Sequence, residues 1–247
     1  MGLFGRWLSP ACPIDLPSRV WLVKHLLWLK DEFGRERLIE SPIIEPSDRF
    51  FPGKYDCSPR AMLQIFHQVC DYMDVPTESV ELQFFRNDAV PYLVTADGLD
   101  AGVAVGTYQG GELKHVIRLD EDKSEDPMTV VSTLSHELAH LRLMGEARID
   151  PMRWDNELLT DLCSIFFGFG IFRLNRPAYS VPTDAVWPGT GIRRPEYMTV
   201  AMSAYALATI TSLRFEERPA WARYLKGAAK SEFRASMKWV EKESKSN

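Results

Sequence analysis

The five residues 136–140, with the sequence HELAH, constrain this chain more than any other segment. Residues four positions apart share one face of an α-helix, so His136 and His140 can bind one metal ion if the segment is helical. Glu137 then lies beside whatever that ion binds. This pattern is typical of zinc-dependent hydrolases. The segment must therefore belong to a helix that is anchored in a core.

The flanking residues predict such a helix. Asp126 can cap free backbone amides and Pro127 suits the first helical position, where no amide hydrogen is needed. Gly145 is a plausible end of the helix. Between them, apolar residues at helical spacing predict one buried face of an amphipathic helix of about five turns: Val130, Val131, Leu134, Leu138 and Leu141.

A third metal ligand is expected in the run NELLTD, residues 156–161. A catalytic zinc ion has three protein ligands and one position for water, so two histidines need one partner. Glu157 and Asp161 are four residues apart and share a helical face. We assign Glu157 as the ligand and Asp161 as the hydrogen-bond partner of a ligand histidine; the reverse assignment, with Asp161 on the metal, stays open. Asp155 is expected to cap this second helix, which apolar residues anchor: Leu158, Leu159, Leu162, Ile165 and Phe166.

HELAH followed by NELLTD resembles the HExxH…ExxxD pattern of gluzincin metallopeptidases. The resemblance implies a zincin-like fold and one zinc ion per chain, with Glu157 as ligand and Asp161 as the residue that orients a histidine. Residues 115–175 also resemble a group of bacterial zincin-like proteins of unassigned substrate. The metzincin pattern HExxHxxGxxH fits less well, because no third histidine follows His140. Peptide deformylases pair HExxH with an upstream cysteine ligand, and no cysteine lies between Cys70 and His136.

Strands are expected before the first helix. Residues 115–119 alternate in polarity and end in an acidic turn. Residues 103–108 are their expected hairpin partner, with Gly110 and Gly111 as the turn. Residues 80–85 are expected to add another strand. In zincin-like folds an edge strand lies beside the active site and pairs with substrate peptides, and we expect residues 115–119 to be that strand. The fold class is therefore α+β, with a small, mostly antiparallel sheet and a mostly helical remainder.

The expected chemistry follows from the ion. Zinc lowers the pKa of a bound water toward about 7, and Glu137 would accept that water's proton and pass it to the leaving amine. A further hydrogen-bond donor often assists; candidates later in the chain, each more easily explained as structural, are Tyr197, Tyr205, Arg193 and Arg194.

Length and composition indicate one domain. The chain has 247 residues, of which 45% are hydrophobic, enough for one core. We expect a single domain over residues 1–240, with a helical part at 17–75, the sheet and zinc helices at 80–172, a helical part at 195–240 and a frayed tail at 241–247. The apolar residues of segment 19–33 are expected to face the core, and the loop 175–195 to border the active site or to be a tethered surface loop.

Cysteine usage and charge limit the setting. The four cysteines form no CxxC pair, and we expect reduced thiols, no secretory signal, no membrane span and a cytoplasmic location. The net charge of −5 argues against a nucleic-acid partner. His25, His67 and His115 are expected to be surface or boundary residues.

Three functions are compatible with these patterns. The leading hypothesis is a zinc metallopeptidase with a peptide or protein substrate. The alternatives are a zinc amidohydrolase acting on a small non-protein amide, and a non-catalytic zinc-stabilised module that binds a partner. A chance HELAH in a helix is disfavoured, since the chain has only five histidines. The oligomeric state stays open.

Overall fold

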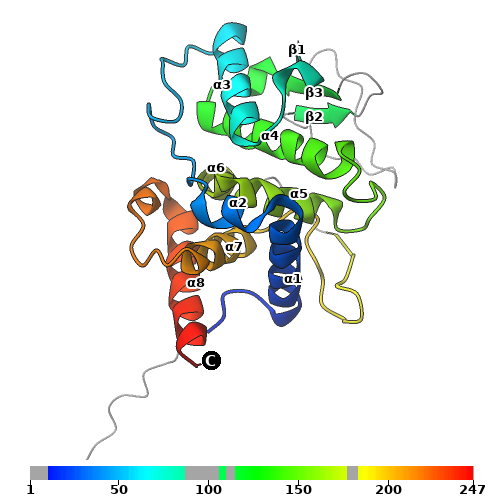
Figure 1. Ribbon diagram of the computed structural model, residues 1–247. Helices are drawn as coiled ribbons and strands as arrows, with labels where there is room; N and C mark the ends of the chain where they lie inside the picture. Colours follow the sequence, from blue (N-terminus) through cyan, green and yellow to red (C-terminus); the bar gives the residue numbers. More distant parts are fainter. Residues whose placement is uncertain (1–10, 87–105, 110–114, 177–182, 247) are drawn as a thin grey trace, which may run out of the picture.

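The computed structural model describes residues 11–86, 106–109, 115–176 and 183–246. The chain is α+β and mostly helical, with one small sheet (Figure 1). Its helices are α1 (Leu16–Phe33), α2 (Arg35–Glu40), α3 (Pro59–Tyr72), α4 (Pro127–His140), α5 (Asn156–Ser164), α6 (Gly170–Asn175), α7 (Val200–Leu213) and α8 (Gly227–Ser246). Its strands are β1 (Val80–Phe85), β2 (Gly106–Gln109) and β3 (His115–Asp120). The expected α+β class is thus confirmed at this level.

The sheet differs from the prediction in two ways. Its strand order is β1-β3-β2, with β3 parallel to β1 and antiparallel to β2. The described sheet is therefore mixed, and the expectation of a mostly antiparallel sheet is wrong for β1. The strand at 115–119 is also central rather than at the edge, because it pairs on both sides. The hairpin partner is confirmed over Gly106–Tyr108; residues 103–105 and the Gly110–Gly111 turn lie outside the described residues.

Helix α4 lies between the sheet and α3 on one side and α5 and α6 on the other. It packs against α3, β2 and β3 on one side and against α5 and α6 on the other (Figure 1). Its start is as predicted: Pro127 occupies the first turn, and the Asp126 side chain accepts a hydrogen bond of 3.0 Å from the amide of Met128. All five predicted apolar positions are buried. Beyond His140 a π-helical turn, Leu141–Gly145, completes the predicted length.

Helix α5 continues through a π-helical turn, Ile165–Phe169, into α6. The chain bends at Gly168, whose φ is +97°, and a Cβ there would lie 2.5 Å from the carbonyl oxygen of Pro42. Only glycine fits this close approach. The chain is therefore kinked at Gly168, after which α6 extends to Asn175.

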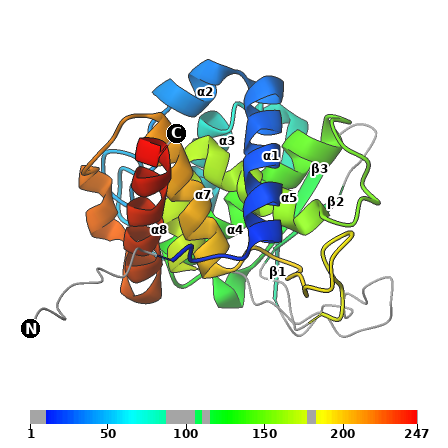
Figure 2. The same ribbon diagram turned by 90° about the horizontal axis from the view of Figure 1, so that it is seen from below.

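The remaining helices form a layer beneath α5. Seen from below, α1, α7 and α8 lie side by side, with α1 also against α5 (Figure 2). The expected core face of the first helix is confirmed, because Trp21, Leu22, Leu26 and Leu29 are buried. Helix α8 continues to Ser246 and includes residues 241–246, which we expected to be a frayed tail. Within the described residues, no helix combines the length and apolar character that crossing a membrane requires.

Candidate metal centre

Three side chains from two helices converge where α4 meets α5. His136 and His140 lie in the last turns of α4, and Glu157 lies in the first turn of α5. One ligand atom from each lies within 4.8 Å of the other two. The Glu157 carboxylate oxygen Oε2 is 3.1 Å from His136 Nε2 and 3.4 Å from His140 Nε2. The structure therefore brings together the three residues that the sequence singled out as ligands.

The spacing of these atoms suits a zinc ion. Zinc binds histidine nitrogen and carboxylate oxygen at about 2.0–2.2 Å in a tetrahedral arrangement, which places neighbouring ligand atoms about 3.3 Å apart. The two distances to Glu157 Oε2, 3.1 and 3.4 Å, are close to that value. The donor set, two imidazoles and one carboxylate, is also one that zinc accepts. The residues present thus fit the metal.

Hydrogen bonds fix which ring nitrogen of each histidine faces this point. The Asp161 carboxylate accepts from Nδ1–H of His136 at 2.9 Å. The hydroxyl of Thr160 donates its one hydrogen to the carbonyl of Asn156 at 2.9 Å, so it can only accept from Nδ1–H of His140, at 3.2 Å. In the neutral form of each ring the lone pair is consequently on Nε2, the atom that faces Glu157, as metal binding requires.

Asp161 lies behind His136 and not among the converging ligand atoms. Its carboxylate is fully buried, forms an ion pair with Arg173 and accepts a 2.9 Å hydrogen bond from the backbone amide of Met198. Three donors thus hold this carboxylate in place. The position matches the role of a residue that orients a ligand histidine.

The charges at the site favour a cation between the ligands. Burial raises the pKa of Glu157, but hydrogen bonds with His136 and His140 outweigh it and hold that pKa far below its ordinary value. Burial lowers the pKa of His136, but hydrogen bonds with Asp161 and Glu157 outweigh it and raise the pKa to about 10. The two carboxylates therefore favour positive charge at this point, either as a proton on His136 or as a metal ion between the ligand atoms.

Glu137 lies next to this group and is buried. Burial raises the pKa of its carboxyl group, and the neighbouring His136 and His140 oppose that rise. A carboxylate with a raised pKa takes up a proton more readily than an exposed glutamate does, which is the property that a general base near neutral pH needs.

Of the later donors that the sequence suggested, the structure places Tyr197 at the site. Its ring centroid is 6.0 Å from that of His136, and burial, followed by the charge of Glu157, raises the pKa of its hydroxyl. Tyr205 lies in α7, where burial, followed by the charge of Glu243 in α8, raises the pKa of its hydroxyl to about 12. Arg193 pairs with Asp184 at 3.1 Å, and the Arg194 guanidinium lies over the ring of Trp154.

Strand β2 supplies a contact that the sequence analysis missed. The ring of Tyr108 is nearly parallel to that of His140, with centroids 6.2 Å apart, and its hydroxyl is hydrogen-bonded to Nδ1 of His115 at 2.8 Å. A Cβ on Gly145 would lie 2.6 Å from that hydroxyl, so the glycine allows the tyrosine to pack here. Within the described sheet β2 pairs only with β3, so it takes the position at the edge that we expected of residues 115–119.

Two other expectations need correction. Asp155 is the residue directly before α5, but its side chain does not cap that helix. Its carboxylate instead accepts hydrogen bonds from Trp21 at 2.8 Å and from Arg153 at 2.6 Å. His25 is buried rather than at the surface. Both differences have one reason: the indole of Trp21 and the guanidinium of Arg153 enclose Asp155 together with His25.

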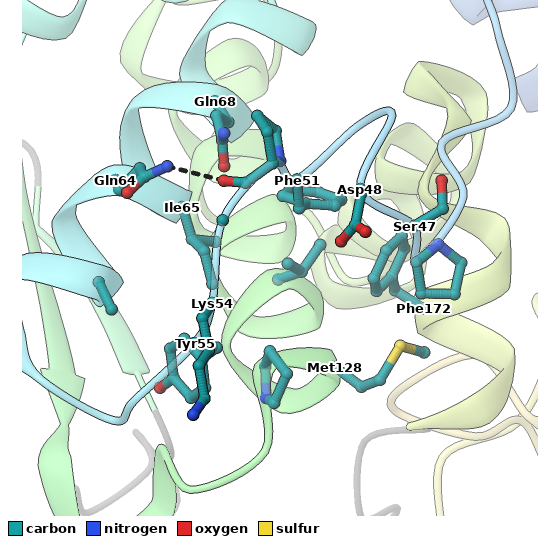
Figure 3. A pocket seen from close by; sticks show the side chains of 16 residues that line it. Ser47, Asp48, Phe51, Lys54, Tyr55, Gln64, Ile65, Gln68, Met128 and Phe172 are labelled. Atoms are coloured by element: carbon teal, nitrogen blue, oxygen red, sulfur yellow. Dashed lines mark hydrogen bonds between the residues drawn. The ribbon is translucent and has the colours of Figure 1, made fainter.

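A cavity of about 200 Å³ lies apart from the metal ligands, beneath the loop of residues 46–55 (Figure 3). Helix α4 lines it with its first turns, through Met128 and Val131, and Phe51 and Phe172 supply aromatic walls. None of the residues that line it belongs to the His136, His140 and Glu157 group. The cavity is therefore a separate site from the group of His136, His140 and Glu157.

Comparisons with protein-family models, with curated proteins and with solved structures each found no match to this chain.

Proposed function

We propose that this chain is a zinc-dependent hydrolase that cleaves peptide bonds, with zinc held by His136, His140 and Glu157. The observation that carries the proposal is the convergence of two Nε2 atoms and one carboxylate oxygen within 4.8 Å, with each ring oriented by a hydrogen bond at Nδ1. A helical coincidence of two histidines would not require these partners behind both rings. The resemblance to gluzincin metallopeptidases supports the same assignment on motif grounds.

In this proposal, bound zinc makes a water molecule acidic and polarises the substrate carbonyl. Glu137 accepts the proton of the attacking water and delivers it to the leaving amine, for which its burial and raised pKa suit it. Asp161 and Thr160 keep the two imidazoles oriented. The hydroxyl of Tyr197 keeps its proton at neutral pH, because its pKa is raised, and it can donate a hydrogen bond to the negative charge that develops on the carbonyl oxygen.

The experiment that tests catalysis is the Glu137→Gln variant of the zinc-loaded protein. Peptidase activity on a proteome-derived peptide library, read by mass spectrometry, should fall by about a thousandfold or more while the zinc content stays unchanged. Glu125→Gln is the matched control, because Glu125 is exposed and lies just before α4. Full activity in Glu137→Gln would contradict the mechanism.

The other two functions predict different results. A small-amide hydrolase would lose activity on simple amides in Glu137→Gln but would leave the peptide library intact. A non-catalytic module would bind zinc and show no hydrolysis that depends on Glu137. The intact glutamate between the two histidines favours catalysis, because a purely structural site has no need of a base there.

A further inference from the structure

The segment that leads into Glu157 carries an unusual amount of exposed apolar surface. Met152 is 85% exposed and Trp154 is 45% exposed. The neighbouring hairpin, in which Val186 pairs with Arg193, adds Val186 at 46% and Ile192 at 43% exposure. Large exposed apolar side chains that cluster beside a site commonly mark a surface that binds a partner or ligand. We call Trp154 together with Arg194 the aromatic shelf.

Buried tryptophans fix the position of this shelf. Trp187 of the hairpin is buried and packs edge-on against Trp154 with ring centroids 6.0 Å apart, and it also contacts Trp21 of α1 at 6.0 Å. The Arg194 backbone amide donates to the carbonyl of Ala185 at 2.9 Å. The shelf is therefore held by the core on one side and by the hairpin on the other.

The shelf lies close to the metal ligands, because two chain segments run from one to the other. Trp154 precedes Glu157 by three residues, and Arg194 precedes Tyr197 by three residues. At one end the Arg194 guanidinium lies 4.8 Å from the ring centroid of Trp154, and at the other the Tyr197 ring lies 6.0 Å from that of His136. Three extended residues span at most about 10 Å, so the shelf is within about three peptide residues of the metal ligands.

The chemistry of Arg194 points to an anionic ligand. A guanidinium that lies over an aromatic ring contacts the ring through the flat face of the guanidinium. The N–H groups in the plane of the guanidinium then remain available to other partners. The one side-chain hydrogen bond described for Arg194 is a long one of 3.5 Å to the carbonyl of Pro195. Among the described carboxylates, Asp155 and Glu196 act on Arg194 through their charges without a hydrogen bond to it. Its planar donors match a carboxylate, which can accept two of them.

We infer that the aromatic shelf is a substrate subsite in which Arg194 binds a carboxylate of the peptide, either an acidic side chain or the C-terminal carboxylate, close to the scissile bond. This inference rests on the proposed function and narrows its substrates to peptides with a carboxylate at a fixed distance from the cleavage point. The apolar residues around the shelf would contact the neighbouring side chains of the peptide. Arg194 is then a specificity-determining residue rather than part of the hydrolytic machinery.

The test measures peptide binding by the full-length, zinc-loaded Glu137→Gln protein, which separates binding from hydrolysis. The probes are fluorescein-labelled eight-residue peptides of alanine and leucine with one glutamate moved through each position, each made with a free and with an amidated C-terminus. Fluorescence anisotropy should show one carboxylate position that tightens binding by about tenfold or more. Arg194→Ala should reduce this gain to less than about twofold. A gain that follows the glutamate identifies a side chain, and one that follows the free C-terminus identifies the chain end.

Arg193→Ala is the matched control, because Arg193 is the adjacent cation but is exposed and paired with Asp184. It should keep the full gain. Zinc content and thermal unfolding of Arg194→Ala must match those of Arg193→Ala. A series in which no carboxylate position matters, or in which Arg194→Ala keeps the gain, overturns the inference. Wild-type protein assayed on the same peptides separates the two proposals: cleavage without carboxylate preference contradicts only the subsite, and Arg194-dependent binding without cleavage contradicts only the hydrolase.

Discussion

Two buried clusters in this protein contain the same three residue types, yet their histidines differ in what they can bind. Each cluster combines a histidine, an aspartate and an arginine, and each aspartate accepts from its arginine. One lies at the metal ligands and the other where α1 meets the start of α5: His136, Asp161 and Arg173 in the first, and His25, Asp155 and Arg153 in the second.

The difference is where the arginine lies relative to the imidazole. In the second cluster His25 donates from Nδ1 to the carbonyl of Trp21 at 2.8 Å, so its Nε2 carries the lone pair, and Arg153 lies 3.2 Å from that atom. A cationic donor therefore occupies the nitrogen that a metal would need. Burial, opposed by the Trp21 carbonyl, lowers the pKa of His25.

In the first cluster Arg173 contacts the aspartate oxygen Oδ1 that also accepts from Nδ1–H of His136. Nε2 of His136 instead faces a second carboxylate, Glu157. The pKa of His136 is accordingly raised to about 10. Residue composition alone thus does not define a metal site; the free nitrogen and the second carboxylate do.

The largest expected effect comes from removing the carboxylate that distinguishes the two clusters. Glu157→Gln should weaken zinc binding by more than about a hundredfold, since a loss from outer-shell partners alone is about 10- to 100-fold. Asp155→Asn, in the second cluster, should leave zinc affinity within a few-fold of wild type. Competition with a chelator of known affinity measures both. Equal losses in the two variants would contradict the comparison.

Asp161→Asn should have the next largest effect, in two readouts. Zinc affinity should fall by about 10- to 100-fold because His136 loses its orienting acceptor. The free energy of unfolding of the metal-free protein should fall by about 3–5 kcal/mol, because the buried Arg173 loses its counter-charge. Urea unfolding measures the second effect, and Asp161→Asn combined with Arg173→Met should recover part of the stability but not the zinc affinity.

A smaller loss is expected from Thr160→Val, which removes the hydroxyl that accepts from His140 while preserving the side-chain shape. Zinc affinity should fall by roughly tenfold, at the low end of outer-shell effects. Thr209→Val is the control, because its hydroxyl also donates to a helix carbonyl but lies in α7. If Thr160→Val binds zinc as tightly as wild type, the hydroxyl does not orient His140.

A final contrast concerns pH, and its sign differs between the clusters. In the metal-free protein the stabilisation from His136 is complete below its unfolded pKa of about 6.5 and is lost as the pH rises through about 10. His25, whose folded pKa is lowered, instead costs stability as the pH falls below about 6.5. Histidine NMR titration of metal-free protein should show His136 still protonated at pH 8 and a titration midpoint of His25 below 6.5. Two ordinary titrations near 6.5 would contradict this contrast.

The sequence predicted that His136, His140 and Glu157 lie together because their spacing follows from helix geometry. His136 and His140 need only the helical repeat, and Glu157 needs only a second helix with an acidic first turn. Apolar periodicity likewise predicted the buried faces of α4 and α5. Helical spacing and apolar periodicity are local properties, so they can be read from the residues of α4 and α5 themselves.

The partners behind the ligands could not be predicted, because they come from distant segments. Arg173 reaches Asp161 only because the chain bends at Gly168, and the Met198 amide reaches it from beyond the hairpin. A single arginine within the apolar run of residues 165–174 was a signal that a buried carboxylate had to lie nearby. The pairing of β3 on both sides depends on β1, whose residues lie 35 positions earlier than their partners, so local alternation could not reveal it.

The measurement that tests the central claim most directly is the zinc content of the purified, reconstituted protein by elemental mass spectrometry, with His140→Ala and His25→Ala alongside. We expect about one zinc ion per chain in the wild type and in His25→Ala, and little in His140→Ala. No zinc in the wild type, or zinc retained in His140→Ala, would show that the His136, His140 and Glu157 group does not bind the metal.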